Sequence, residues 1–272
     1  MTMVKLLALD VDGTLIGADF AVSPRTRAAI AAAQAQGVRV SLVTGRNWPT
    51  TRPYVQELGL DAPQVVFNGA VVTADGSGAT LHARALEWPL IDALITIARR
   101  HSLFLELHTM EHCFIERIGP ESVFQQTKLG DDQVLAHFDA LDRNEPILKA
   151  QFVLPRVAQR RLLLRAVEEL DGSAVLSWGV STGFPGWFVN VMLPGEDKDT
   201  GLEIALAHLG LGWGEVLAVG DSPSDLTFVT RAGLGFVMGN APKDVRQAAP
   251  HVAPPVQEDG LAQIIEQHVL RG

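Results

Sequence analysis

The sequence predicts an α/β fold, a doubly wound parallel sheet that is interrupted by an inserted α+β module. Short apolar runs without alternation occur near both ends of the chain, and such runs are typical of strands buried on both faces. Helical segments separate these runs. Between them, strands with alternating side chains and amphipathic helices take over. We therefore expect residues 1–80 and 195–272 to form one domain and residues 81–194 to form a second domain.

The first domain begins with an apolar strand over residues 4–9. Ser23 is a typical N-cap, and Pro24 suits the first position of a helix. The elements that we expect next are a helix over residues 25–36, a strand over 38–43, a helix over 48–58 and a strand over 65–67. This βαβαβ order predicts parallel strands that are joined by crossover helices.

The strands of the inserted module differ from those of the first domain, because their apolar and polar residues alternate. Its expected strands cover residues 104–109, 113–116, 150–154, 174–178 and 187–192, and its expected helix covers residues 156–170. Leu105 and Leu107 share one face of the first of these strands, whereas Glu106 and His108 share the other. After the module we expect a helix over residues 200–209, a strand over 215–219, a helix over 226–232, a strand over 236–238 and a helix over 261–269.

The amino-acid composition excludes several classes of protein. The 272 residues are 47% hydrophobic, enough for a sizeable core, and the formal net charge of −9 argues against general nucleic-acid binding. Cys113 is the single cysteine, so it forms no internal disulfide, and we expect it to be a small core hydrophobe. No apolar stretch approaches the roughly 18 residues of a membrane span. We expect a cytoplasmic protein without a membrane or nucleic-acid partner.

Two aspartates directly follow the first strand. Asp10 and Asp12 point the same way if this segment is extended, at the strand end where open α/β sheets bind ligands. Two carboxylates held so close repel unless a cation lies between them or one takes a proton. Gly13 then allows a sharp turn. A pair of acids in an ordinary polar loop is the alternative interpretation.

Candidate anion-binding groups follow the second strand and precede a later helix. The Thr44 hydroxyl and the Gly45 amide can both donate to an anion, although a plain turn would contain the same residues. Lys198 lies just before the helix that resumes the βα order, with Thr200 as a possible cap. By itself, Lys198 would suit an ordinary solvated surface position.

A second pair of aspartates follows the strand that ends at residue 219. Asp221 and Asp225 could be helix caps, or they could join Asp10 and Asp12 around a metal. Mg2+ is usually held by one or two carboxylates together with substrate phosphate. The spacing therefore predicts a Mg2+ site at the carboxyl edge of the sheet, with donors for phosphate beside it.

These motifs together resemble a known family. Asp-x-Asp-Gly-Thr from Asp10, Thr-Gly-Arg from Thr44, the lone Lys198 and Gly-Asp-Ser-x-x-Asp from Gly220 form the signature of haloacid-dehalogenase-like phosphatases. The long interval before Lys198 leaves room for the α+β cap of the Cof-type, class IIB branch. Segments 237–241 and 258–260 are also similar to Cof-type sequences. The resemblance implies a Rossmann-like catalytic core and a cap domain.

The resemblance also implies a role for each motif residue. Asp10 is the nucleophile and becomes a phosphoaspartate, while Asp12 protonates the leaving oxygen and then activates water. The implied Mg2+ ligands are Asp10, the Asp12 backbone carbonyl and Asp221, with Asp225 in support. Thr44, the Gly45 amide and Lys198 would bind the transferring phosphoryl group.

Three positions depart from the pattern of the family. Ser224 stands where Cof-type enzymes commonly have Asn, Asp199 follows Lys198 where Gly is usual, and Asn190 stands where related sequences often have Glu. The expected activity is Mg2+-dependent hydrolysis of a small phosphorylated metabolite, with a sugar phosphate as the favoured class. A hexose phosphomutase and a catalytically silent metabolite-binding protein are the alternatives.

Substrate discrimination is expected to reside in the cap. Glu106 and His108 face away from the leucines of their strand and could bond substrate hydroxyls, or this face could simply be solvated. The stretch from His108 to His112 fits the zinc-peptidase pattern H-x-x-E-H. That pattern needs both histidines on one helix face, whereas here it spans a strand and a turn, so we do not expect a zinc peptidase.

Overall fold

The computed structural model describes residues 3–180 and 184–270. The chain divides into two compact units. The first comprises residues 1–46, 51–82 and 197–272, and the second comprises residues 47–50 and 83–196. The domain boundaries expected from the sequence, at residues 80 and 195, remain a prediction. Across the described residues, no helix combines the length and the apolar character needed to cross a membrane.

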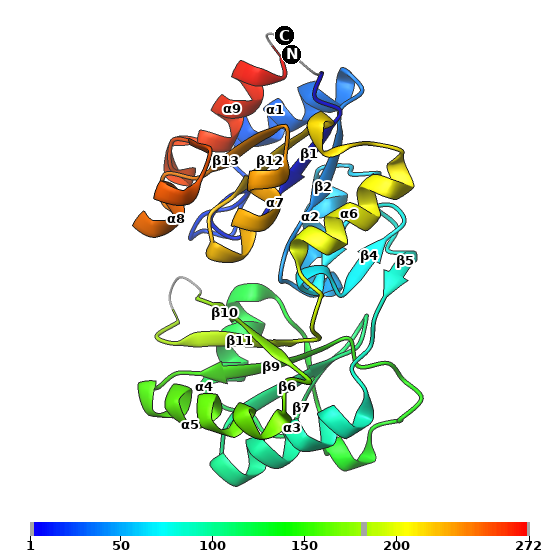
Figure 1. Ribbon diagram of the computed structural model, residues 1–272, viewed down its shortest axis with the longest axis vertical. Helices are drawn as coiled ribbons and strands as arrows, with labels where there is room; N and C mark the ends of the chain where they lie inside the picture. The colour runs from blue at the N-terminus through cyan, green and yellow to red at the C-terminus, as the bar shows by residue number, and fades with distance from the viewer. Residues whose placement is uncertain (1–2, 181–183, 271–272) are drawn as a thin grey trace. The chain divides into compact units, whose positions relative to one another are not determined.

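The first unit contains a five-stranded sheet (Figure 1). In spatial order its strands are β14 (His251–Val252), β13 (Leu234–Val237), β12 (Val216–Gly220), β1 (Leu6–Leu9) and β2 (Arg39–Leu42). Every neighbouring pair is parallel. The expected doubly wound parallel sheet is therefore confirmed.

Strand β1 lies at the point where the order of the sheet reverses. Leu9 is in register with Leu42 of β2 on one side and with Val219 of β12 on the other. The chain reaches β2 through helix α1 (Pro24–Ala35), and it returns to β12 only after the second unit. Ligands of open α/β sheets bind at such a reversal, outside the carboxyl ends of the strands.

Helices cover both faces of this sheet, which explains its uninterrupted apolar strands. Helices α6 (Lys198–Leu209) and α7 (Leu226–Arg231) lie on one face, and α1 and α9 (Gly260–His268) lie on the other (Figure 1). Leu6 and Ala8 of β1 share a core with Leu202 of α6 and Phe228 of α7. The remaining elements are α2 (Trp48–Glu57), α8 (Lys243–Ala248) and a small sheet of β3 (Val65–Val66), β4 (Val71–Thr73) and β5 (Thr80–Ala83).

The helix caps confirm one expectation and correct another. Ser23 caps α1, since its hydroxyl accepts from the Thr26 amide. Thr200 is not the cap of α6. Asp197 takes that position and accepts from the Thr200 amide, while the Thr200 hydroxyl accepts from the Asp197 amide in return. Because this capping box starts the helix one residue before Lys198, the lysine occupies the first helical position.

The second unit is built on a six-stranded sheet. Its strands are, in spatial order, β10 (Val175–Gly179), β11 (Trp187–Met192), β9 (Lys149–Leu154), β6 (Phe104–His108), β7 (Cys113–Ile115) and β8 (Gln133–Leu135). All pairs are antiparallel except β7 with β8. Its helices are α3 (Trp88–His101), α4 (Pro120–Phe124) and α5 (Val157–Val167) (Figure 1).

The two faces of this sheet differ in chemistry. Leu105 and Leu107 pack with residues of α3 and α5 in a continuous apolar core, as the alternation predicts. The opposite face carries Glu106 and His108. Both of these side chains are buried, so this face is not a solvated surface.

We expect Asp197→Ala to lower the free energy of unfolding by about 0.5–2 kcal/mol, because it removes the cap of α6. Asp197→Ser keeps a short acceptor at the cap and should recover most of that loss. Urea denaturation of the three proteins measures the difference. Equal stability of the alanine and serine variants would contradict the capping role.

Candidate active site

The ends of β1 and β12 meet around a glycine. Asp10 directly follows β1, is only 4% exposed, and donates its amide to the Val219 carbonyl at 2.9 Å. Gly13 has a φ of +84°, and a Cβ there would lie 2.0 Å from Asp221 Oδ2. Only glycine accommodates both this backbone conformation and the approach of Asp221. The turn after β1 therefore brings the first and last aspartate motifs together.

Lys198 bridges two of the carboxylates. Its Nζ lies 2.6 Å from Asp10 Oδ1 and 2.7 Å from Asp225 Oδ1, and the residue is 5% exposed. Burial alone would lower the pKa of Lys198, but Asp10 and Asp225 more than offset that effect and raise it. Lys198 is therefore a buried, charged ammonium, and the solvated surface position is excluded.

Asp225 organises the loop that carries Asp221. Its Oδ1 accepts from Lys198, and its Oδ2 accepts from the Asp221 amide at 3.0 Å, from the Ser222 amide at 2.8 Å and from the Ser222 hydroxyl at 2.7 Å. Because Oδ2 already accepts three hydrogen bonds and Oδ1 is paired with the Lys198 ammonium, Asp225 is suited to position its neighbours rather than to ligate an ion directly.

The carboxylates form a set of donors for a hard cation. Oxygen atoms of Asp10, Asp221 and Asp225 all lie within 4.8 Å of one another. Burial and the neighbouring charges of Asp225 and Asp221 raise the pKa of Asp10 well above its usual value, against the opposing effect of Lys198. Burial and Asp225 raise the pKa of Asp221 to about 7. A divalent ion with a preference for oxygen would relieve this repulsion, so the residues fit such a metal.

Asp12 is held by an arginine whose role the sequence did not reveal. Arg46 donates from Nε and Nη2 to the two Asp12 oxygens, both at 2.7 Å. The Asp12 side chain is 47% exposed, whereas that of Arg46 is 8% exposed and lies near the rings of Phe20 and Tyr54. A bidentate pair of this kind fixes the orientation of the carboxylate. Thr-Gly-Arg was recognised as a motif, but this contact links positions too far apart in the sequence to be read from it.

Thr44 and Gly45 follow β2 as expected, and a further amide group lies beside them. Thr44 is 1% exposed, and its Oγ1 accepts from the Arg46 amide at 3.1 Å. A Cβ on Gly45 would lie 2.7 Å from Asn68 Oδ1. Asn68 is buried with a φ of +56°, and its Nδ2 has no hydrogen-bond partner among the residues that the structure describes. Such a buried donor needs an acceptor, and this marks Asn68 as a candidate that sequence reasoning missed.

Asn240 is a second missed residue. Its Nδ2 donates to the Gly13 carbonyl at 2.9 Å and to Asp221 Oδ2 at 3.3 Å, and its Oδ1 accepts from the Val256 amide. Asn240 thus connects the turn after β1 to the aspartate after β12. The similarity of segment 237–241 to Cof-type sequences was the available signal.

Of the residues that depart from the pattern of the family, Asp199 and Ser224 have side-chain partners, whereas Asn190 Oδ1 has no hydrogen-bond partner among the described residues. Asp199 pairs with Arg231 Nη1 at 2.5 Å, so its charge is engaged by that arginine. The Ser224 hydroxyl lies 2.8 Å from the Ser222 hydroxyl. Asn190 belongs to β11 in the second unit.

The candidates from the cap lie in the second unit. Glu106 is fully buried and accepts from the amide groups of Gln125, Gln133 and Gln151. His108 is 1% exposed at the end of β6, whereas the side chain of His112 is 54% exposed beyond the strand. The two histidines therefore do not share a helix face. A role of Glu106 and His108 in substrate recognition stays a prediction.

Comparison with known proteins shows to which family the chain belongs. The model of the haloacid dehalogenase-like hydrolases matches residues 7–265. The chain belongs to this family. It is similar to the 5-amino-6-(5-phospho-D-ribitylamino)uracil phosphatase YcsE of Bacillus subtilis (strain 168), with 27% identity over 98% of this chain and 96% of that protein. The expected enzyme class, a phosphatase, is confirmed by these matches.

Solved structures of haloacid dehalogenase-like hydrolases share the fold. One from Bacteroides thetaiotaomicron has a TM-score of 0.87 at 25% identity and covers 97% of this chain and 99% of its own. A sugar phosphatase of subclass IIB has a TM-score of 0.79 at 20% identity and covers 97% and 98%. Phosphatases of this superfamily typically use a divalent metal.

We expect the metal-free protein to lose stability as the pH rises. The pKa of Asp221 is raised to about 7 in the folded state, so its contribution is fully present below about pH 4 and is lost as the pH rises through about 7. With a chelator present, the melting temperature should fall from pH 5.5 to pH 8, and Asp221→Asn should flatten that fall. Excess Mg2+ should also reduce it. The same slope in wild type and Asp221→Asn would exclude Asp221 as the cause.

Proposed function

We propose that this phosphatase is Mg2+-dependent and hydrolyses a small phosphorylated metabolite, most characteristically a sugar phosphate, through a phosphoaspartate on Asp10. The observation that carries the proposal is the buried Lys198 ammonium, which bridges Asp10 and Asp225 at the point where the sheet reverses. The substrate class is supported by the relatives, which include a phosphatase of a phosphoribityl compound and a sugar phosphatase.

The charges of the site favour a divalent ion over Lys198 alone. Asp10, Asp221 and Asp225 carry three negative charges when ionised, and Lys198 supplies one positive charge. Two like charges about 4 Å apart repel by about 4 kcal/mol at an effective dielectric constant of about 20. A phosphate dianion adds two more charges, so one ammonium is too little. Asp10, the Asp12 carbonyl and Asp221 would hold Mg2+, which when bound neutralises carboxylate and phosphate charge.

The first half-reaction transfers the phosphoryl group to the protein. An Asp10 carboxylate oxygen attacks phosphorus, the bond from phosphorus to the ester oxygen breaks, and Asp12 gives a proton to the departing oxygen. Lys198, the Thr44 hydroxyl, the Gly45 amide and the amide group of Asn68 would hold phosphoryl oxygens. Positioning and charge neutralisation are the main requirements of phosphoryl transfer, and these donors meet them.

The second half-reaction returns the protein to its starting state. Water attacks the phosphorus of the phosphoaspartate, Asp12 takes the water proton, and Asp10 is released as a carboxylate with inorganic phosphate. The two hydrogen bonds from Arg46 would keep the Asp12 carboxylate in one orientation during this step.

We expect Asp10→Asn to abolish phosphate release from p-nitrophenyl phosphate, because an amide cannot act as the nucleophile. Asp199→Asn is a matched control, since Asp199 is paired with Arg231 and should tolerate the same change with little effect on turnover. Ca2+ should inhibit, because its larger and looser coordination shell misplaces nucleophile and phosphate. Activity of Asp10→Asn near that of the control, or full turnover with excess chelator, would overturn the mechanism.

We expect Asp12→Asn to slow turnover by roughly 10²–10⁴-fold, the usual contribution of general acid–base catalysis. The metal site should survive, because the proposed ligand at this position is a backbone carbonyl. Alkyl phosphates, whose leaving oxygen needs a proton, should lose more activity than p-nitrophenyl phosphate. Steady-state kinetics on both substrate types measures this difference, and equal losses would show that Asp12 is not the general acid.

A further inference from the structure

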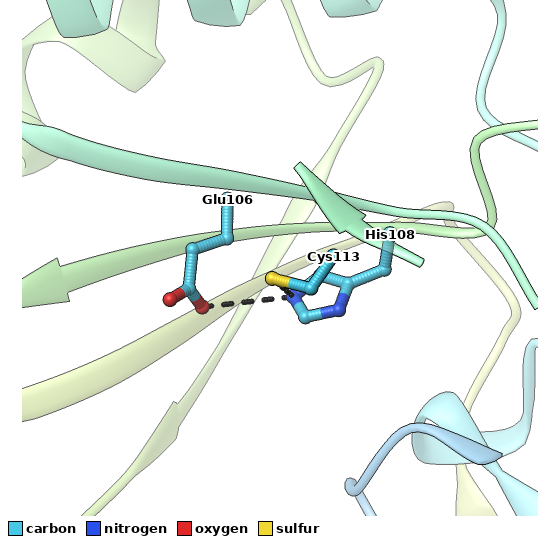
Figure 2. A group of neighbouring side chains, drawn as sticks. All are labelled: Glu106, His108 and Cys113. Atoms are coloured by element: carbon cyan, nitrogen blue, oxygen red, sulfur yellow. Dashed lines mark hydrogen bonds and ion pairs between the residues drawn. The ribbon is translucent and has the colours of Figure 1, made fainter. Parts of the chain in front are cut away.

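A second group of side chains that could hold a metal ion lies inside the second unit. We propose that Glu106, His108 and Cys113 form a binding site for a zinc-like divalent ion. Glu106 and His108 lie on β6, and Cys113 is directly opposite His108 in the register of β6 and β7. Figure 2 shows the Glu106 carboxylate and the Cys113 sulfur both approaching the same nitrogen of the His108 ring. All three are buried.

The spacing suits four-coordinate geometry with one position left open. His108 Nε2 lies 3.6 Å from Glu106 Oε2 and 3.8 Å from Cys113 Sγ, and the three ligand atoms are all within 4.8 Å of one another. Zinc bonds of about 2.0–2.3 Å at the tetrahedral angle place neighbouring ligand atoms about 3.3–3.6 Å apart. Shifts of a few tenths of an ångström would bring both His108 contacts to these distances, and the carboxylate and the sulfur, which lie within 4.8 Å of each other, would close around the ion.

The Glu106 carboxylate is oriented in advance by three amide groups. Gln125 and Gln133 donate to its Oε1, and Gln151 donates to its Oε2 at 2.7 Å. Hydrogen bonds of this kind are what hold metal-binding carboxylates in position. Each Glu106 oxygen can accept further contacts, so the amide groups fix the carboxylate without excluding an ion.

His108 is in the form that binds metals. Burial and the nearby charge of Lys149 lower the pKa of His108 to about 3, so the ring is neutral. The Asn47 amide nitrogen is a donor and lies 3.4 Å from His108 Nδ1, so in the metal-free protein Nδ1 accepts and the ring proton lies on Nε2. Metal binding at Nε2 would require this proton to move to Nδ1 and the Asn47 amide nitrogen to shift away from the ring. Asp131 accepts from that same nitrogen at 2.9 Å, and its negative charge favours a proton on the ring.

The charge balance also favours a divalent ion. Glu106 and Asp131 bring two negative charges close to the one positive charge of Lys149. Metal binding would displace the Cys113 proton to solvent and add a thiolate charge. The two carboxylates, the thiolate, the ammonium and a divalent ion then sum to zero. Because the donors are one sulfur, one nitrogen and one oxygen, the site suits Zn2+ and not the oxygen-seeking Mg2+.

A catalytic cysteine is a poorer interpretation of the same cluster. Burial raises the pKa of the Cys113 thiol well above its usual value, whereas a nucleophilic cysteine needs a lowered one. The sulfur and the Glu106 carboxylate both approach His108 Nε2, so the carboxylate does not orient the ring from its far side. Convergence on one point is the arrangement of ligands and not of a catalytic triad.

The test is Co2+ binding to the full chain after treatment with a chelator, in excess Mg2+ to occupy the aspartate site. We expect a thiolate-to-cobalt absorption band and the intense visible bands of four-coordinate cobalt, saturating at one equivalent and removed by Zn2+. Cys113 is the only cysteine in the chain, so a thiolate band can come from no other residue. Cys113→Ser and His108→Ala should lose the band, and Asp221→Asn should keep it.

A further variant tests the site without changing a ligand, in case a ligand substitution prevents folding. Gln151→Ala leaves the three ligands in place but removes one amide group from Glu106, and it should weaken Co2+ binding by about 10–100-fold. Absence of the thiolate band in wild type, its persistence in folded Cys113→Ser, or unchanged affinity in Gln151→Ala would each overturn the proposed site. None of these measurements depends on the phosphatase reaction.

Discussion

Mutual repulsion among buried and half-buried carboxylates is the constraint on which the first unit depends. Asp10, Asp221 and Asp225 converge where β1 and β12 end, and Lys198 is the ammonium that bridges two of them. The surrounding fold is arranged around this contact, since α6 begins at Lys198 and only glycine fits at position 13 beside Asp221. The strain of the metal-free cluster and its affinity for a cation thus have the same electrostatic origin.

The second unit stabilises its buried polar groups with neutral hydrogen-bond donors and one lysine. Its carboxylate, Glu106, is surrounded by neutral amide groups and by Lys149, and its neighbours are an imidazole and a thiol. Burial raises the pKa of Glu106 to about 7 despite these partners. The cluster therefore lowers the stability of the fold unless all of its polar groups have hydrogen-bond or ligand partners. The first unit offers only oxygen donors, whereas the second offers oxygen, nitrogen and sulfur donors. The two sites would therefore prefer different metal ions, Mg2+ in the first unit and a zinc-like ion in the second.

Local patterns predicted most of the fold and the positions of the motifs. Apolar runs predicted β1, β2, β12 and β13, and polar residues at strand ends indicated the site, because both depend on neighbours in the sequence. Strand β14 was not predicted, and the strand expected over residues 65–67 is β3, which pairs antiparallel with β4 in a separate small sheet. What the sequence did not show depends on contacts between distant segments. Examples are the Arg46 pair with Asp12 and the Asn68 amide nitrogen, for which no described residue is an acceptor. Thr200 was a possible cap of α6 from the sequence, but the capping box places Asp197 at the N-cap and Thr200 at the third helical position.

A direct measurement of the central claim is chemical trapping of the phosphoenzyme. The protein is mixed with substrate and Mg2+, quenched in acid within one turnover, reduced with borohydride and digested for mass spectrometry. Reduction of an acyl phosphate converts aspartate to homoserine, and the account predicts this conversion at Asp10, dependent on both substrate and Mg2+. Turnover without conversion at Asp10, or conversion at another aspartate, would contradict it.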